Sequence, residues 1–216
     1  MTKEQLIETI AKRVAQEFKD GDLVNLGIGM PTMVSNYIPQ GINIILQSEN
    51  GMLNMGPMPS EDKANKRITN AGGMPSSILE GGMFFDSAFS FSLIRGGHVD
   101  ITVLGALEVD EEGNLANWII PGKLVPGMGG AMDLVNGVKK VIIMMEHTDK
   151  NGNSKVKKKC SLPLTGAKCV DLLVTELGVF GFRNGKMQLL ELQPNVTLQE
   201  LRAKTEASFE VCIKEK

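Results

Sequence analysis

The stretch Leu46-Gln47-Ser48-Glu49-Asn50-Gly51 closes an apolar run, residues 42–46, and turns sharply at its end. The run is rich in β-branched residues, which predicts a buried strand. The pair Asn50-Gly51 accepts the backbone angles of a tight turn. We therefore expect Glu49 at the carboxyl edge of a sheet, where ligands bind in open α/β folds. An acidic side chain there suits a ribose-hydroxyl acceptor, a general base or a nucleophile.

A solvated surface turn is the other interpretation of Glu49. The segment that follows, residues 52–59, has the sequence Met-Leu-Asn-Met-Gly-Pro-Met-Pro. It is apolar and conformationally restricted, which a solvated turn does not need. We expect its Met and Pro residues to shield the carboxylate from water.

The remaining helix and strand patterns place this strand in a larger fold. Helices are predicted at 2–18, with a capping box between Thr2 and Gln5, and from Thr197 onward. Strands are predicted at 23–26, 99–104, 141–145 and 170–175, hairpins at 107–118 and 180–192 (about Asn184-Gly185), and an exposed loop at 59–73. Residues 84–94 fit a strand or an inward segment near the site. The pattern predicts one α/β domain, residues 1–216, with a single open, mainly parallel sheet, flanking helices and additional antiparallel hairpins.

Two glycine loops are candidates for binding a ligand. The first follows the strand at 23–26 and contains Gly27 and Gly29, with Pro31 at the start of the next helix. Asn25 lies just before this loop in an apolar strand, so its side chain should hydrogen-bond to backbone or to the site. The second loop, residues 121–130, leads into a helix. There the N–H groups of Gly129, Gly130 and Ala131 are candidates for binding one oxygen together, although a loop that serves packing alone remains the alternative.

Composition excludes several classes of protein. The 216 residues are 42% hydrophobic and carry a formal charge of −2, which marks neither a nucleic-acid nor a membrane surface. Cys160, Cys169 and Cys212 form no C-x-x-C pair, which indicates reduced thiols and a cytoplasmic protein. With only His98 and His147 and no H-E-x-x-H motif, we expect no metal. The amphipathic start of the chain does not have the pattern of a signal peptide, and no apolar run is long enough to span a bilayer.

The hexapeptide around Glu49, with the apolar residues after it, resembles the active-site signature of the B (β) subunit of family I CoA-transferases. Four further segments are similar to that family, in its usual order: Asn-Leu-Gly-Ile-Gly-Met-Pro at 25–31, Ile-Arg-Gly-Gly-His at 94–98, Leu-Ala-Asn-Trp at 115–118, and 121–133 with Gly-Met-Gly-Gly-Ala-Met-Asp. Together they cover most of residues 22–181.

The resemblance implies a reaction and a set of roles. Glu49 would take the acyl group and then CoA itself, forming a glutamyl-CoA thioester without a metal or a permanently bound cofactor. Ser48, Asn50 and Gly51 would support the nucleophile. Asn25 and the glycines of both loops would bind substrate or the oxyanion. The substrates would be short-chain acyl-CoA with acetoacetate, acetate or butyrate, and Asn54, where relatives often carry glycine, would affect the acyl pocket. The partner would be an A (α) subunit in an α2β2 heterotetramer, and the chain alone would be inactive.

Two other functions remain open from the sequence. Gly27-x-Gly29 followed by an acidic residue about 20 positions later imitates the fingerprint of a dinucleotide-binding oxidoreductase. Thr32 at the third small position and Pro31, which lacks an N–H group, depart from that pattern. The third possibility is a non-catalytic assembly subunit, in which Glu49 would be dispensable.

Overall fold

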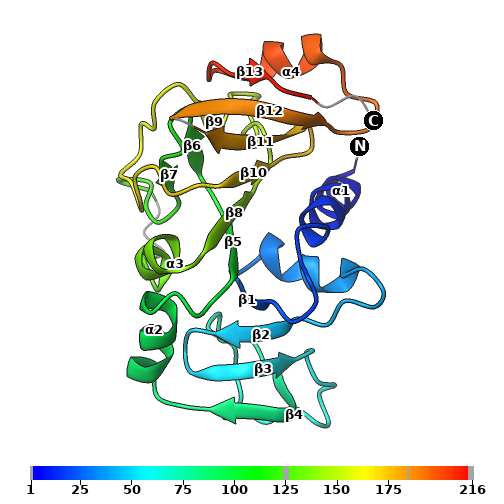
Figure 1. Ribbon diagram of the computed structural model, residues 1–216, viewed down its shortest axis with the longest axis vertical. Coiled ribbons are helices and arrows are strands. Elements are labelled where there is room, and N and C mark those ends of the chain that lie inside the picture. Colours follow the sequence, from blue (N-terminus) through cyan, green and yellow to red (C-terminus); the bar gives the residue numbers. More distant parts are fainter. Residues whose placement is uncertain (1, 124–126, 184, 214–216) are drawn as a thin grey trace.

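The strand that precedes Glu49 lies inside one extended, twisted sheet (Figure 1). The computed structural model describes residues 2–123, 127–183 and 185–213. Ten strands form the sheet in the order β13-β12-β11-β10-β8-β5-β1-β2-β3-β4. Within these described ranges, no helix is long and apolar enough to cross a membrane.

The four central strand pairs are parallel, as predicted for a mainly parallel α/β fold. The pairs toward the two ends are antiparallel, except that the terminal strand β13 pairs parallel to β12. The parallel strands are β1 (Leu23–Leu26), β2 (Ile45–Ser48), β5 (Ile101–Gly105), β8 (Lys140–Met144) and β10 (Leu172–Val174). The strands at the ends are β3 (Met52–Gly56), β4 (Ser77–Phe84), β11 (Gly178–Arg183), β12 (Lys186–Leu192) and β13 (Glu210–Val211). Strands β5, β8 and β10 are almost wholly buried, because helices cover both of their faces.

Two hydrophobic clusters lie on opposite faces of the sheet. Helix α1 (Lys3–Ala15) packs on one face through Ile10, Ala11 and Val14, and its capping box between Thr2 and Gln5 is formed as predicted. Helices α2 (Ser87–Arg95) and α3 (Ala131–Gly137) cover the other face, where α4 (Leu198–Lys204) also contributes Leu201. The segment after the first glycine loop is a 3-10 helix, η1 (Met30–Tyr37).

The structure corrects two expectations about secondary structure. The strand before Glu49 begins at Ile45 rather than at residue 42, because residues 42–44 pair with no neighbouring strand. Most of residues 84–94 are the helix α2, capped by Asp86, whose carboxylate accepts the N–H of Phe89 at 2.8 Å. The turn residue Asn184 lies outside the described residues, while the hairpin strands on either side of it are present.

The hairpin predicted at 107–118 exists, but it belongs to a second, three-stranded sheet of β7 (Leu115–Ala116), β6 (Glu108–Asp110) and β9 (Val156–Lys157). The carboxylate of Asp110 closes its turn by accepting the N–H groups of Glu112 and Asn114, both at 3.1 Å. This small sheet lies away from the strand that carries Glu49 (Figure 1).

Candidate active site

Glu49 follows the last residue of β2 directly, at the edge where the parallel strands β1, β2 and β5 all end. The N–H of Gly51 donates to the carbonyl oxygen of Ser48 at 3.0 Å, which closes the turn around Glu49. Gly51 has a φ of +116°, and a Cβ there would lie 2.0 Å from the carbonyl oxygen of Phe85. Only glycine fits this position, so glycine at position 51 is a structural requirement of the turn.

The turn is also fixed from outside by the loop before β4. The hydroxyl oxygen of Ser48 accepts the N–H of Ala71 at 2.9 Å, and the side chain of Asn50 donates to the carbonyl oxygen of Thr69 at 2.8 Å. Both side chains therefore hold the turn that carries Glu49, and their role in supporting a nucleophile stays a prediction.

Asn25 holds the carboxylate of Glu49 from the neighbouring strand. Its Nδ2 donates to Oε2 of Glu49 at 3.0 Å and to Oε1 of Gln47 at 2.8 Å. The parallel register places Asn25 beside Gln47, two residues before Glu49. Asn25 is fully buried, so the hydrogen bonds predicted for it are formed to the site and, at 3.4 Å, to the backbone of Gln47.

The first glycine loop serves the sheet more than a ligand. The N–H of Gly27 donates to the carbonyl oxygen of Val103 at 2.8 Å, and a Cβ at Gly27 would lie 3.1 Å from that oxygen. The expectation that the Gly27 amide binds a ligand is therefore wrong, because β5 occupies it. Gly29, with a φ of +83°, caps η1 by accepting the N–H and hydroxyl of Thr32. A 3-10 helix with proline in its first turn does not offer the α-helix N-terminus of a dinucleotide site.

The second glycine loop reaches Glu49 itself. A Cβ at Gly130 would lie 3.4 Å from Cγ of Glu49 and 3.1 Å from the ring of Phe91. Residues 124–126 of this loop lie outside the described residues. The N–H of Ala131 donates to the carbonyl oxygen of Met128 at 3.2 Å, so the expected set of three amides is reduced to Gly129 and Gly130, for which no backbone acceptor occurs among the described residues.

Two helices bring this loop to the carboxylate. Gly137 at the end of α3 approaches the backbone of α2 closely, since a Cβ there would lie 2.4 Å from the carbonyl oxygen of Ile94. Arg95 of α2 and Asp133 of α3 form an ion pair at 2.6 Å. The contact between α2 and α3, which Figure 1 shows beside β2, therefore determines where Gly130 lies.

The predicted shield of Met and Pro residues does not form over Glu49. Strand β3 runs antiparallel to β2, with Ser48 opposite Met52, so the chain beyond β3 leads toward the opposite edge of the sheet. Met58 is 60% exposed there. Asn54 adopts a φ of +59° at an irregularity of β3 and donates to the carbonyl oxygen of Glu80 at 2.9 Å. Its side chain thus forms a bond between β3 and β4, and its effect on an acyl pocket stays a prediction.

Two cysteines and one histidine are the other side chains considered as a nucleophile or a base, and burial makes each of them unsuited to that role. Burial raises the pKa of the Cys169 thiol to about 11, and burial with the nearby Asp110 carboxylate raises that of Cys160 as well. His147 is fully buried between the hydroxyls of Thr175 and Thr205, and burial lowers its pKa to about 4. Among the described residues the three cysteines are free, and no group of His, Cys, Asp and Glu could hold a metal ion.

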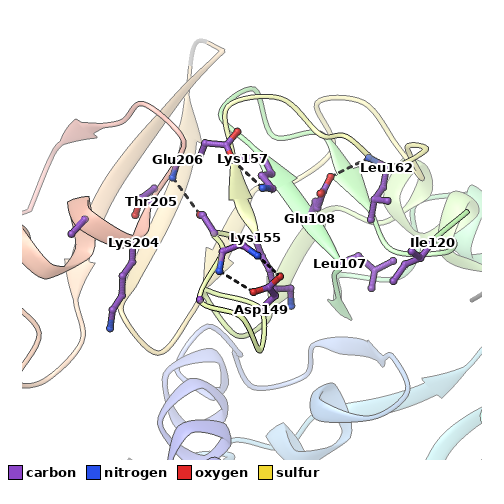
Figure 2. A pocket seen from close by; sticks show the side chains of 14 residues that line it. Leu107, Glu108, Ile120, Asp149, Lys155, Lys157, Leu162, Lys204, Thr205 and Glu206 are labelled. Atoms are coloured by element: carbon purple, nitrogen blue, oxygen red, sulfur yellow. Dashed lines mark hydrogen bonds and ion pairs between the residues drawn. The ribbon is translucent and has the colours of Figure 1, made fainter. Parts of the chain in front are cut away.

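A cavity of about 570 Å³ lies apart from Glu49, between the small sheet and α4. Figure 2 shows the side chains that line it, among them Glu108, Lys155 and Lys157. Glu108 accepts the N–H groups of Ser161 and Leu162, and Lys157 forms an ion pair with Glu206 at 2.9 Å. Most of its charges are therefore used within the protein, and none of its lining residues belongs to the Glu49 site.

Sequence reasoning missed the residues behind the carboxylate. Gln47, Ser90 and Thr102 are buried polar side chains that connect to Asn25. Phe91, which contacts Gly130, was also not identified. The signal that could have found them is the presence of Gln47 and Thr102 inside otherwise apolar strands, because a buried polar side chain requires a partner.

Comparison with known proteins gives a consistent result. Residues 7–204 match the family model described as Coenzyme A transferase. The beta subunit of the acetate CoA-transferase of Escherichia coli K12 is 60% identical over 94% of this chain and 93% of its own length. The B subunit of a probable succinyl-CoA:3-ketoacid coenzyme A transferase of Bacillus subtilis is 57% identical over 94% of both chains. The crystal structure of an acyl-CoA transferase apoenzyme from Escherichia coli O157:H7 has the same fold, with a TM-score of 0.75 at 20% identity over 96% of this chain and 42% of that one.

Proposed function

Because the chain belongs to the coenzyme A transferase family, we propose that it is the catalytic B chain of an enzyme that moves CoA through a thioester on Glu49. The observation that carries this proposal is the position of Glu49 between a side-chain donor and a glycine loop. Asn25 donates to one carboxylate oxygen at 3.0 Å, and Gly130 packs against the same side chain. A carboxylate held in this way has one oxygen fixed and the other available to attack.

The proposed reaction conserves the thioester bond in two exchanges. The carboxylate of Glu49 attacks the carbonyl carbon of an acyl-CoA, and CoA leaves as a thiolate, which gives a mixed anhydride. The thiolate then attacks the glutamyl carbonyl, and the first acid leaves as a carboxylate. An incoming acid reverses both exchanges and departs as the new acyl-CoA. No oxidant, metal or ATP is consumed, and CoA acts as substrate and covalent intermediate without a permanently bound cofactor.

Each exchange passes through an oxyanion, and the site offers two kinds of donor for it. The N–H groups of Gly129 and Gly130 are proposed to bind the oxyanion of the substrate carbonyl. A single such donor is worth about 3 to 4 kcal/mol in comparable sites. Asn25 is proposed to serve the glutamyl carbonyl, because its N–H already meets Oε2 of Glu49. Ser48, Asn50 and Gly51 hold the turn, and Gly29 shapes the neighbouring loop.

The partner is proposed to be an A (α) subunit, in an α2β2 heterotetramer that acts in the cytoplasm. Support comes from the names of the relatives, which are a beta and a B subunit of their enzymes. Since Glu49 is only half-buried and the expected shield is absent, the partner is proposed to complete water exclusion.

The sheet uses strands from Leu23 to Val211, which supports a single domain over residues 1–216.

The proposed substrates are a short-chain acyl-CoA and a short-chain carboxylic or 3-oxo acid, with acetate, butyrate and acetoacetate as the first to test. This choice rests on relatives named for acetate and for succinyl-CoA with a 3-ketoacid. The folded geometry of the first glycine loop does not favour the dinucleotide alternative.

The test is mass spectrometry of the chain co-expressed with its A subunit and mixed with acetoacetyl-CoA in the absence of an acceptor acid. We expect a CoA adduct on the peptide that contains Glu49, and discharge of the adduct when acetate is added. Turnover without any adduct would overturn the covalent mechanism. Turnover by a Glu49→Ala variant would instead assign this chain to a non-catalytic role.

A further inference from the structure

Four buried polar side chains form a connected network behind Glu49. Asn25 of β1, Gln47 of β2, Thr102 of β5 and Ser90 of α2 are each at most 1% exposed. The hydroxyl of Thr102 donates to Oδ1 of Asn25 at 3.3 Å. Nδ2 of Asn25 donates to Oε1 of Gln47 at 2.8 Å, and Nε2 of Gln47 donates to the hydroxyl oxygen of Ser90 at 2.9 Å. The network ends at Oε2 of Glu49, 3.0 Å from Nδ2 of Asn25.

The charge of Glu49 determines the direction of every bond in this network. An ionised carboxylate only accepts hydrogen bonds, so Asn25 must turn its NH2 group toward it. The oxygen of Asn25 then faces Thr102, which must donate, and the second N–H of Asn25 faces Gln47, which must accept. Gln47 in turn directs its own NH2 group to Ser90. If Asn25 were rotated by half a turn, its oxygen would face the carboxylate oxygen and both would be repelled.

We propose that Gln47, Ser90 and Thr102 are positioning residues that fix the Asn25 amide with its NH2 group toward Glu49. This inference rests on the proposed function of Glu49 and extends it to three residues that do not touch the carboxylate. All three are buried away from bulk water between the sheet and α2. Among the described residues, no buried side-chain nitrogen or oxygen is left without a partner, so the network is complete as it stands.

A fixed donor matters because Glu49 changes its chemical state during the reaction. As a carboxylate it accepts the Asn25 N–H, and as an acyl group it presents a carbonyl oxygen at the same place. Negative charge builds on that oxygen whenever a thiolate or a carboxylate attacks the glutamyl carbon. A donor already oriented toward it requires no rearrangement at that moment, whereas a mobile amide would have to turn first.

Thr102 offers a pair of substitutions that separates positioning from packing. Thr102→Val keeps the methyl group and the β-branched shape in β5 but removes the donor to Asn25. Thr102→Ser keeps the donor and removes only the methyl group. If Thr102 served packing alone, Thr102→Ser would lower the rate more than Thr102→Val. If Thr102 positions Asn25, Thr102→Val lowers the rate more.

The experiment measures the rate of CoA adduct formation on Glu49 by quenched-flow mass spectrometry, in the complex with the A subunit and with acetoacetyl-CoA as the probe. For Thr102→Val we expect a rate at saturating acyl-CoA lower by about 10- to 100-fold, the size of effect that misplaced catalytic groups produce. We expect the KM for acetoacetyl-CoA to be unchanged, and Thr102→Ser to restore most of the rate. Ser90→Ala, which acts from α2 through Gln47, is expected to slow the same step.

The outcomes separate this inference from the proposed function. If wild type and Thr102→Val form the adduct equally fast, or if serine is as slow as valine, the positioning role is wrong while the function of Glu49 stands. If wild type forms no adduct at all, the proposed function falls and the network loses its premise. Unfolding by urea, measured on each variant complex, shows whether a rate change reflects loss of folded protein.

Discussion

Gly130 lies directly against Glu49, although 81 positions separate the two residues: a Cβ at Gly130 would lie 3.4 Å from Cγ of the glutamate. The ring of Phe91 closes the same space, at 3.1 Å from that Cβ position. The glycine therefore lets the backbone of the second glycine loop approach the carboxylate as closely as a side chain otherwise would. This approach can be tested by adding a single methyl group.

Gly130→Ala should impair the reaction more than the fold. The φ of Gly130 is −83°, which alanine accepts, so the cost is crowding against Phe91 of about 1 to 3 kcal/mol. The new methyl group displaces the loop from Glu49, and we expect adduct formation at least about tenfold slower. Gly181→Ala is the matched control, because its Cβ would lie 3.0 Å from Leu190 in β12, far from the site. Equal rates in both variants would contradict a role for close approach.

Glu49→Asp should abolish most activity while leaving the protein folded. The shorter side chain withdraws the carboxylate by one methylene from the substrate and from Asn25, and such a displacement costs about 100-fold in rate. Steady-state turnover of the complex with its A subunit measures the loss. Glu4→Asp, at the exposed start of α1, makes the same chemical change outside the site and should be neutral. Near-normal turnover of Glu49→Asp would argue against covalent catalysis.

Gly51→Ala should destabilise the protein strongly. Its φ of +116° is unfavourable for alanine, and its Cβ would lie 2.0 Å from the carbonyl oxygen of Phe85, which is backbone and cannot turn away. We expect a loss of about 3 kcal/mol in the free energy of unfolding, measured with urea. Gly41→Ala has a similar positive φ with open space around it, so only about 1 kcal/mol is expected. Equal losses would mean that the contact with Phe85 has relaxed.

The stability of the protein should fall as the pH drops from about 6.5 to about 4, in part through His147. Burial, with Lys204 and Lys155 nearby, lowers the pKa of folded His147 to about 4, while the unfolded chain has the ordinary value of 6.5. Between these values the unfolded state binds a proton that the folded state does not, so acid favours unfolding. The contribution of neutral His147 to the free energy of unfolding is complete above pH 6.5 and is reduced by up to about 3 kcal/mol at pH 4.

Urea unfolding of His147→Gln across this pH range tests the assignment. The variant should be less stable than wild type at pH 7, because it lacks the paired ring, and it should lose less stability on acidification. His98→Gln is the control, since His98 is exposed and should leave the pH dependence of wild type intact. If the free energy of unfolding of His147→Gln depends on pH as in wild type, His147 is not the cause. The loss of stability in acid would then be assigned to carboxylates whose pKa values are lowered by ion pairs, such as Glu17 and Glu206.

Local patterns in the chain were sufficient for much of the fold. Thr2 with Gln5 and Thr197 with Glu200 cap their helices as expected, because a cap involves residues three positions apart. The β-branched runs predicted the parallel strands and the edge at which Glu49 lies. The helix at 87–95 was missed because Ser and Phe at this spacing also fit a strand pattern. The hydrogen bond from Phe89 to the Asp86 cap stabilises the helix, but it forms only when the backbone turns at Asp86.

The sequence by itself determined the identity of the family and the strand that carries Glu49, since motifs and strand patterns consist of residues close together in the chain. The requirement for glycine at position 51 comes from the tertiary structure, because a Cβ there would meet the carbonyl oxygen of Phe85. Only the tertiary structure decided that Asn25 donates to Glu49, that Gly27 serves the sheet and that Gly130 reaches the carboxylate. It likewise decided that Gln47, Ser90 and Thr102 share one buried network. The physical reason is that hydrogen bonds and close contacts depend on distances in space, and strand register and the packing of α2 on α3 bring together atoms that no local pattern relates.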